Sequence, residues 1–431
     1  MKILVIAPQP FFVPRGVPFS VYAQLGALSE LGHHTDLVTY PFGEPVALPR
    51  VRVWRIPSLP FVREVRIGPS SAKLFFDLVL FLWACWRLCC QRYDCICTHE
   101  EAGVCGVVLA ALFRCRHVYY MHSNLAQQAA CLGYARRRWM LHILRWLQRW
   151  VIRHASAVVA ICPALEQEAW QMGARGRTYL IENVILPETL SADLSEAARE
   201  RCLRKGEAGR LTGADGLAIT APAQRETVTS LGQYELLPES CETGPLVLYT
   251  GTLERYQGIE LLLESAVLVR RRCPTVRYLI VGGRPDQIAA LQLRCRRLGI
   301  EDGVEFLGQR PAMEMPIYME QATILVSPRC AGANTPLKLA SYLYSGKPLL
   351  ATLIAAHTQV LTPEVALLVP PTPHGLAAGT LFLLENPSYA RALACAARRF
   401  ANRRWSWSSF VAQQQRLYAE VVAAKRGSAC Q

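Results

Sequence analysis

The chain of 431 residues is 52% apolar and carries a formal net charge of +14 at pH 7. Its length predicts two domains with a sizeable core, and its longest apolar stretch, residues 74–86, is too short to span a bilayer. The 16 cysteines lack the repeated CxxC spacing of a zinc site, which favours free thiols in a reducing cytoplasm. The basic excess indicates an anionic partner: a membrane surface, nucleic acid or a phosphorylated substrate.

The first half of the chain alternates strands with helices, which predicts a Rossmann-like parallel sheet. Strands are expected at residues 2–8, 34–39, 51–56, 94–98, 117–121, 157–162 and 179–182. The first strand follows Met1 directly, with no cleavable leader expected. The GxGxxG dinucleotide fingerprint is absent from the loop after it. Gly16 is the residue of that loop that would let the backbone approach a ligand closely.

His122 directly follows the expected strand at residues 117–121. Parallel sheets bind their ligands at the carboxyl ends of the strands, so this position suits a catalytic group. A single histidine after a strand is also common as a structural residue, and the pattern alone leaves both roles open.

Residues 134–152 are expected to form an amphipathic helix rich in tryptophan and arginine. Trp139 and Trp146 fall on one stripe of this helix, and Arg137, Arg138 and Arg145 supply the charge. Such a helix can lie on an anionic bilayer, or it can pack in a core with its arginines reaching solvent. Membrane contact is the favoured interpretation because the apolar stretch at residues 74–86 precedes it in the same domain.

The second half alternates in the same way and predicts a second sheet. Strands are expected at residues 246–250, 278–281, 304–307, 322–326, 349–352 and 366–369, with helices at 258–272, 288–298, 315–321, 337–344 and 375–384. Residues 388–425 are expected to be helical, with a break near Trp405 and Trp407.

The predicted fold class is therefore α/β, with two Rossmann-like, doubly wound domains facing a cleft. The N-terminal, acceptor-side domain is expected at residues 1–186. Residues 187–244 lose periodicity and are interpreted as a linker or insertion. The nucleotide-sugar-binding domain is expected at residues 245–387, followed by C-terminal helices at residues 388–431 that pack back on the first domain.

The stretch at residues 326–352 has the pattern of a ligand-binding unit. A buried strand leads into a loop containing Gly332, Asn334 and Thr335, and a helix then begins near Pro336. A helix N-terminus beyond the carboxyl end of a parallel strand offers N–H groups to a phosphate. Arg329 and Lys338 flank it, and both are expected to reach a diphosphate. A packed turn with two solvated cations is the other interpretation.

Taken in order, these stretches resemble a family 4 glycosyltransferase of the retaining GT-B type. The resemblance rests on RGVPFSVYAQLGALSELGH, HVYYMHS, AVVAICPAL, LVLYTGTLERYQGIELLLESA, YLIVGG and TPLKLASYLYSGKPLLAT, and it covers nearly the whole chain apart from residues 189–244. It implies a metal-independent hexosyl- or glycosyltransferase that uses a nucleotide sugar as substrate and has no other cofactor.

The resemblance also implies roles for individual residues. His122, Lys338 and Arg329 are the expected catalytic residues. The expected donor-binding residues are Gly16, Gly251, Arg255, Gly283, Asn334, Thr335, Pro336, Leu337 and Ser341. Transfer in this family is described as front-face: the leaving diphosphate takes the acceptor proton while cations stabilise its charge.

The chain departs from the family at the donor site. The family usually carries two glutamates eight residues apart, and those positions hold Ala333 and Ser341 here. The arginine and lysine that the family carries at the start of the donor domain correspond to Thr252 and to a position at or near Gln257. Ser341 can form one hydrogen bond to a ribose hydroxyl but cannot accept a bidentate pair as a carboxylate does.

The favoured interpretation is an active, divergent enzyme on the cytoplasmic face of the membrane. It would move a sugar to a lipid-linked or polysaccharide acceptor, with retention. The main alternative is a non-catalytic GT-B-like subunit of a membrane polysaccharide or glycolipid assembly complex. A nucleotide-sugar epimerase is a weaker alternative. Nucleic-acid binding is suggested by charge alone and is not expected.

Overall fold

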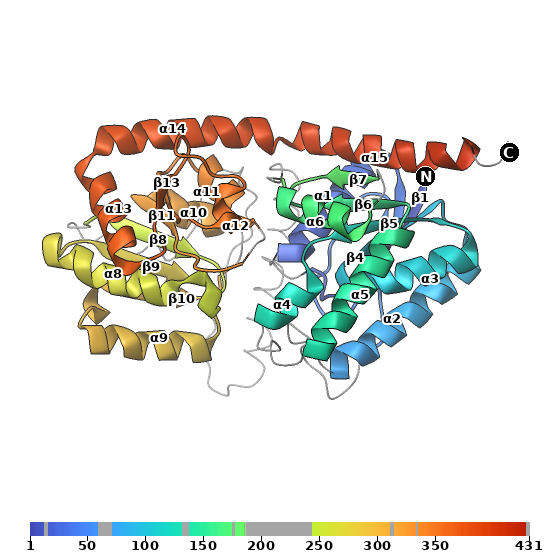
Figure 1. The fold of residues 1–431 in the computed structure, drawn as a ribbon, viewed down its shortest axis with the longest axis horizontal. Coiled ribbons are helices and arrows are strands. Elements are labelled where there is room, and N and C mark those ends of the chain that lie inside the picture. Colours follow the sequence, from blue (N-terminus) through green and yellow to red (C-terminus); the bar gives the residue numbers. More distant parts are fainter. Residues whose placement is uncertain are drawn as a thin grey trace, which may run out of the picture.

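The computed structural model describes residues 1–12, 16–58, 71–131, 138–174, 177–184, 186, 244–310, 314–332 and 335–427, which form two α/β domains side by side (Figure 1). The predicted linker at residues 187–244 lies outside the described residues except for Gly244, as do Arg137 and Asn334.

The N-terminal domain is built on a seven-stranded parallel sheet in the order β3-β2-β1-β4-β5-β6-β7. The strands are β1 (Lys2–Ala7), β2 (His34–Thr39), β3 (Val51–Arg55), β4 (Cys95–His99), β5 (Arg116–Met121), β6 (Ala157–Ala160) and β7 (Thr178–Leu180). The helices are α1 (Gly16–Glu30), α2 (Ser71–Cys90), α3 (Gly103–Phe113), α4 (Leu125–Cys131), α5 (Arg138–His154) and α6 (Pro163–Met172), with the 3-10 turn η1 (Glu100–Ala102).

Both faces of this sheet are covered, which explains why its central strands are almost continuously apolar. Along β1, Ile3 and Val5 pack in a core that includes residues of α1, whereas Leu4 and Ile6 pack in a core with α2 and α3. Successive strand residues point to opposite faces, so one apolar run supplies both cores.

The second domain repeats this architecture with six parallel strands in the order β10-β9-β8-β11-β12-β13. The strands are β8 (Leu246–Thr250), β9 (Arg277–Val281), β10 (Val304–Gly308), β11 (Ile324–Ser327), β12 (Leu349–Thr352) and β13 (Leu367–Val369). The helices are α8 (Ile259–Arg272), α9 (Pro285–Leu298), α10 (Met315–Gln321), α11 (Lys338–Tyr344), α12 (Ala355–Thr358) and α13 (Pro373–Glu385), with 3-10 turns η3 (Arg255–Gln257) and η4 (Glu301–Gly303).

The strand order reverses between β1 and β4 in one sheet and between β8 and β11 in the other. Doubly wound sheets bind ligands outside the carboxyl ends of the strands at such switch points. The topology therefore predicts that ligands contact the residues that follow β4 and β5 in the first domain and β8 and β11 in the second.

Two C-terminal helices join the domains. Helix α14 (Pro387–Arg404) packs against α11 and α13, and α15 (Trp407–Gly427) packs against α1, so together they run along both domains at the top of Figure 1. On α15, the Tyr418 hydroxyl accepts a hydrogen bond from Gln24 Nε2 at 2.8 Å, and Gln414 Oε1 accepts one from the Tyr120 hydroxyl at 2.7 Å. The helix break at residues 405–406 allows the crossing back to the first domain that the sequence predicts.

The elements follow the sequence prediction with small shifts at their ends. Helix α9 begins three residues earlier than predicted, at Pro285. Pro285 fits because proline is tolerated in the first helical turn. Helix α11 begins at Lys338, one residue later than predicted. The sequence does not predict helices α4 and α12, and α12 has four residues, too few to show apolar periodicity.

Candidate active site

His122 follows β5 and forms a buried pair with His99, the last residue of β4. The two side chains are 4% and 0% exposed, their ring planes differ by 25° with centroids 5.1 Å apart, and His99 Nδ1 lies 2.8 Å from His122 Nε2. Burial lowers the pKa of His122 to about 3. Burial, and then the charge of His122, hold the pKa of His99 well below its ordinary value. Both imidazoles are therefore neutral at physiological pH.

Glu100 and Ser123, the residues that follow this pair in sequence, are also in contact. The Ser123 hydroxyl donates to Glu100 Oε2 at 2.8 Å, and Gln148 Nε2 donates to the Ser123 carbonyl at 2.9 Å. Glu100 adopts a left-handed backbone conformation, with φ 52°. Burial, and then the charge of Glu101, raise the pKa of Glu100 to about 7. A carboxyl with such a pKa can hold or release a proton near neutral pH.

Lys338, the first residue of α11, lies at the carboxyl end of β8. Its amine is 3.7 Å from the centroid of the Tyr249 ring and 3.3 Å from the Thr250 carbonyl oxygen, to which it donates. Burial, and then the charge of Arg329, hold the pKa of Lys338 well below its ordinary value. The site thus places two basic side chains close together, and a bound dianion would stabilise the charged form of both.

Around Lys338 and Arg329, glycines allow the backbone to lie close to other backbone segments and to side chains. Gly251 follows β8 with φ 138°, and a Cβ at Gly282 would lie 2.0 Å from the Gly251 carbonyl oxygen. A Cβ at Gly283 would lie 2.2 Å from Leu253 Cδ1. Gly332 has φ 107°, and its Cβ would lie 2.3 Å from a terminal nitrogen of Arg329. A side chain at Gly282 would displace the backbone at Gly251, and one at Gly332 would displace the Arg329 guanidinium.

Arg329 is itself held from several directions. It is 9% exposed, its Nε donates to the Ala331 carbonyl at 2.8 Å, and its guanidinium lies 5.1 Å from the Tyr256 ring centroid. The Thr352 hydroxyl donates to the Arg329 carbonyl oxygen. These contacts position the guanidinium beside the β11–α11 loop.

The two domains touch at the predicted donor residues. A Cβ on Gly16, at the start of α1, would lie 3.5 Å from Leu337 Cδ1 in the second domain. The backbone N–H of Thr335 hydrogen-bonds the thiol of Cys162. The Ala164 N–H donates to Gln359 Oε1 at 3.1 Å. Residues far apart in sequence, from the start of α1 and the loop before α11, are therefore brought together.

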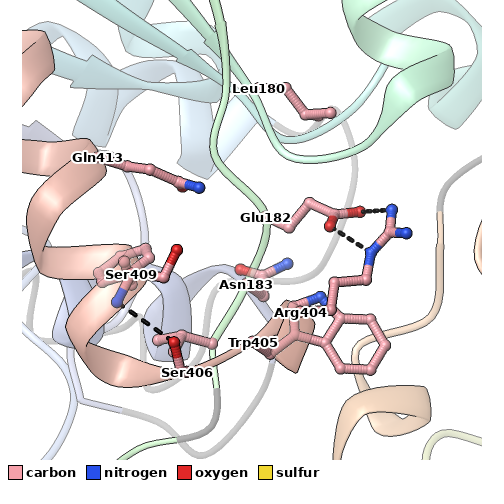
Figure 2. A pocket seen from close by; sticks show the side chains of 10 residues that line it. Leu180, Glu182, Asn183, Arg404, Trp405, Ser406, Ser409 and Gln413 are labelled. Carbon is pink, nitrogen blue, oxygen red and sulfur yellow. Dashed lines mark hydrogen bonds and ion pairs between the residues drawn. The ribbon is translucent and has the colours of Figure 1, made fainter. Parts of the chain in front are cut away.

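A pocket of about 200 Å³ lies where the chain crosses between the domains (Figure 2). Glu182 and Arg404 form a two-contact ion pair on its wall, at 2.7 and 2.9 Å, and Asn183 lies beside them. A smaller cavity containing His122 shares Glu182, Asn183 and Phe410 with this pocket. The predicted histidine therefore lies near the crossing of the chain rather than on an isolated face.

The remaining predicted site residues that the structure describes lie in or next to η3, α11 and α5. Arg255 lies exposed in η3, Ser341 is exposed on α11, and Pro336 precedes that helix. On α5, Arg138 and Arg145 are exposed. Among the described residues, no group of three or more His, Cys, Asp and Glu side chains is placed to hold a metal ion.

Comparisons with known proteins agree with this architecture. The family profile described as "Glycosyltransferase Family 4" matches residues 14–188, and the profile described as "Glycosyl transferases group 1" matches residues 244–386. The chain belongs to glycosyltransferase family 4. The two matches correspond to the two domains, and they fall on either side of the stretch that the structure leaves undescribed.

Individual relatives of this family 4 chain extend the comparison. The phosphatidyl-myo-inositol mannosyltransferase of Mycobacterium leprae is 28% identical over 212 residues, which are 49% of this chain and 55% of that protein. The chain thus matches about half the length of its curated relatives.

Solved structures match over nearly the whole chain. Sucrose-phosphate synthase from Thermosynechococcus elongatus has a TM-score of 0.72 at 20% identity and covers 98% of this chain and 99% of its own. Anabaena HepE in complex with UDP has a TM-score of 0.66 at 18% identity and covers 97% and 100%. At these identities the likeness shows the fold, which is GT-B.

Sequence reasoning did not single out His99, Glu100 or the aromatic ring beneath Lys338. The first two follow directly from the strand expected at residues 94–98, so the carboxyl-end rule that found His122 also points to them. Tyr249 lies within a buried strand, and nothing in the sequence distinguishes it from a core tyrosine.

Proposed function

We propose that this family 4 chain transfers a sugar from a nucleotide-diphosphate sugar to a lipid-linked or polysaccharide acceptor, with retention and without a metal. The observation that carries this proposal is the approach of Gly16 to Leu337, which sets the N-terminal domain against the loop before α11. The histidine pair lies at the carboxyl end of one sheet and two cations lie at that of the other. A donor held between the domains would meet both.

The second domain is suited to a diphosphate. Arg329 and Lys338 both lie by the β11–α11 unit, and each lowers the cost of binding negative charge. The diphosphate leaves with growing negative charge, which fixed cations stabilise in the transition state. In a retaining front-face transfer the leaving oxygen takes the proton of the acceptor hydroxyl, so this scheme requires no carboxylate nucleophile.

The first domain would then serve the acceptor. His122 is neutral, because burial lowers its pKa to about 3. A neutral imidazole can orient a hydroxyl by a hydrogen bond without competing with the diphosphate for its proton. The curated relative is named for mannosyl transfer to phosphatidyl-myo-inositol, which supports a lipid-linked acceptor.

The donor is tested by thermal unfolding with UDP-, GDP-, ADP- and TDP-sugars, with EDTA present to remove metals. A ligand at 100 times its Kd adds about 2.7 kcal/mol to the stability of the native state. We expect one nucleotide series to raise the Tm and the matching sugar to be consumed with an acceptor lipid extract. Failure of every nucleotide sugar to bind would contradict the proposal.

The non-catalytic subunit remains a second candidate because of Ser341. This exposed serine of α11 occupies a position where the family usually has a glutamate. Binding of a nucleotide sugar without its consumption, across acceptors of both classes, would favour this candidate over the enzyme.

We further propose that the N-terminal domain rests on the cytoplasmic face of an anionic membrane. Trp139 and Trp146 on α5 are 65% and 64% exposed, so this stripe is not buried in the core. Helix α2 adds a second exposed apolar stripe at four-residue spacing, formed by Leu74, Leu78, Leu82 and Trp86. Within the described residues, no helix is both long and apolar enough to cross a bilayer. Apolar side chains at headgroup depth with arginines around them match interfacial binding.

Vesicle flotation tests this surface. Replacing Arg138, Arg145 and Arg149 of α5 by Gln removes three exposed charges. At about 1 kcal/mol per arginine, partition onto vesicles containing phosphatidylglycerol should weaken about 100-fold. The matched control replaces Arg271, Arg296 and Arg297, which are exposed in the second domain, and should float as the wild type does. Equal binding by both triple variants would contradict the proposed surface.

A further inference from the structure

The histidine pair continues into a chain of hydrogen bonds that reaches the C-terminal helix α15. His99 Nε2 lies 4.0 Å from the sulfur of Cys97, two residues earlier on β4. That sulfur accepts a hydrogen bond from Gln24 Nε2 at 3.2 Å and is also hydrogen-bonded to the Tyr418 hydroxyl. Each of these side chains is at most 1% exposed, so solvent does not compete for the bonds.

The contacts limit where the protons along this chain can lie. Burial raises the pKa of the Cys97 thiol to about 12, so the sulfur keeps its proton. Gln24 Nε2 donates to that sulfur, which leaves the thiol proton for the Tyr418 hydroxyl or for His99 Nε2, and we infer the second arrangement. His99 is neutral and carries one ring proton, which must then reside on Nδ1. From there it is donated to His122 Nε2, at 2.8 Å.

We propose that His99 is a positioning residue that fixes His122 in a single tautomer, with its proton on Nδ1. His122 then presents an N–H donor, rather than a lone pair, to a sugar hydroxyl. This inference rests on the proposed transfer reaction and adds to it that the buried imidazole orients an oxygen and does not act as a base.

Packing fixes the plane of the two rings as well. The Tyr120 ring lies 5.0 Å from that of His99 and 6.3 Å from that of His122, at interplanar angles of 31° and 23°. The Tyr120 hydroxyl donates to Gln414 on α15 at 2.7 Å. Helix α15 therefore contacts the surroundings of the histidine pair at two points. Gln414 bonds Tyr120, and Tyr418 bonds Cys97.

The test compares three variants. His99→Leu removes the donor to His122, and His99→Asn keeps an amide N–H near the position of Nδ1. His117→Leu is the control, because His117 is 1% exposed, lies on the neighbouring strand β5 and bonds Thr98 Oγ1 at 2.7 Å rather than His122. Loss of this control histidine should affect stability comparably, which the Tm of each variant checks.

We expect His99→Leu to lower kcat about 10- to 100-fold while the donor KM changes little. The reason is that His99 contacts His122 rather than the substrate, so its loss changes the orientation of His122 and not donor binding. His99→Asn should recover most of the loss, and His117→Leu should keep the wild-type kcat. A wild-type kcat in His99→Leu, or an equal loss in His117→Leu, would overturn the inference.

The tautomer is read independently of turnover. With ¹⁵N-labelled histidine, the ring nitrogens of His122, identified by its loss in His122→Asn, should report a single Nδ1–H form from pH 5 to pH 8. His99→Leu should convert it to a mixture of tautomers. An Nε2–H form or a mixture in the wild type would refute the inference. Absence of transfer with any donor would instead refute the proposed function.

Discussion

Lys338 provides the sharpest test of the donor site. We consider Lys338→Met, which keeps an unbranched apolar side chain against the Tyr249 ring but removes the ammonium group, whose nitrogen lies 3.7 Å from that ring's centroid. A hydrogen bond to a charged group contributes about 1.5–3 kcal/mol. Loss of the ammonium should therefore weaken binding of the cognate nucleoside diphosphate about 10- to 150-fold.

The same substitution should not unfold the protein. The pKa of Lys338 is held below its ordinary value, first by burial and then by Arg329, so the charged form destabilises the native state. Wild-type stability should accordingly rise as pH increases from the folded-state pKa toward the ordinary value near 10.4, where the unfolded chain also loses its proton. Lys338→Met should lack this contribution over that range.

Isothermal titration gives the Kd, and thermal unfolding from pH 7 to pH 10 gives the stability. Lys347→Met is the matched control, because the Lys347 amine is exposed and bonds the Glu320 carbonyl at 2.6 Å. An unchanged Kd in Lys338→Met, or an equal loss in Lys347→Met, would remove Lys338 from the donor site. A large fall in Tm would show that the amine serves packing instead.

Three further predictions concern other parts of the site. Gly16→Ala should keep the wild-type Tm, because its Cβ makes an ordinary 3.5 Å contact with Leu337. Gly16→Leu should weaken nucleotide-sugar binding, which titration measures. Equal binding by the two variants would place the donor elsewhere. The pKa of Glu100 is raised to about 7 in the native state, so the carboxyl ionises there at higher pH than in the unfolded chain. The native state therefore loses up to about 3 kcal/mol of stability as pH rises from 4.5 through 7. Glu100→Gln should flatten the Tm profile over this range, and an unaltered profile would contradict the raised pKa. Glu182→Gln should cost about 1 kcal/mol in urea unfolding, since it breaks a partly buried, two-contact pair with Arg404, and an unchanged unfolding midpoint would show that the pair contributes nothing.

The amino-acid sequence by itself determined the elements and their class. Apolar runs of four to six residues between turn signals gave the parallel strands, and helical spacing with proline near the start and glycine past the end gave the helices. The carboxyl-end rule also predicted the position of His122, because it depends only on which strand a residue follows. Family membership followed from short motifs in the right order.

The tertiary structure decided which residues meet. The contact of His122 with His99 requires β4 and β5 to be neighbours, and strand order is not encoded within either strand. The approach of Gly16 to Leu337 and the bonds of Tyr418 on α15 join residues hundreds of positions apart. Such contacts depend on how whole domains pack, so local periodicity cannot reveal them. The sequence identified the chemical groups, and packing set their distances, burial and pKa values.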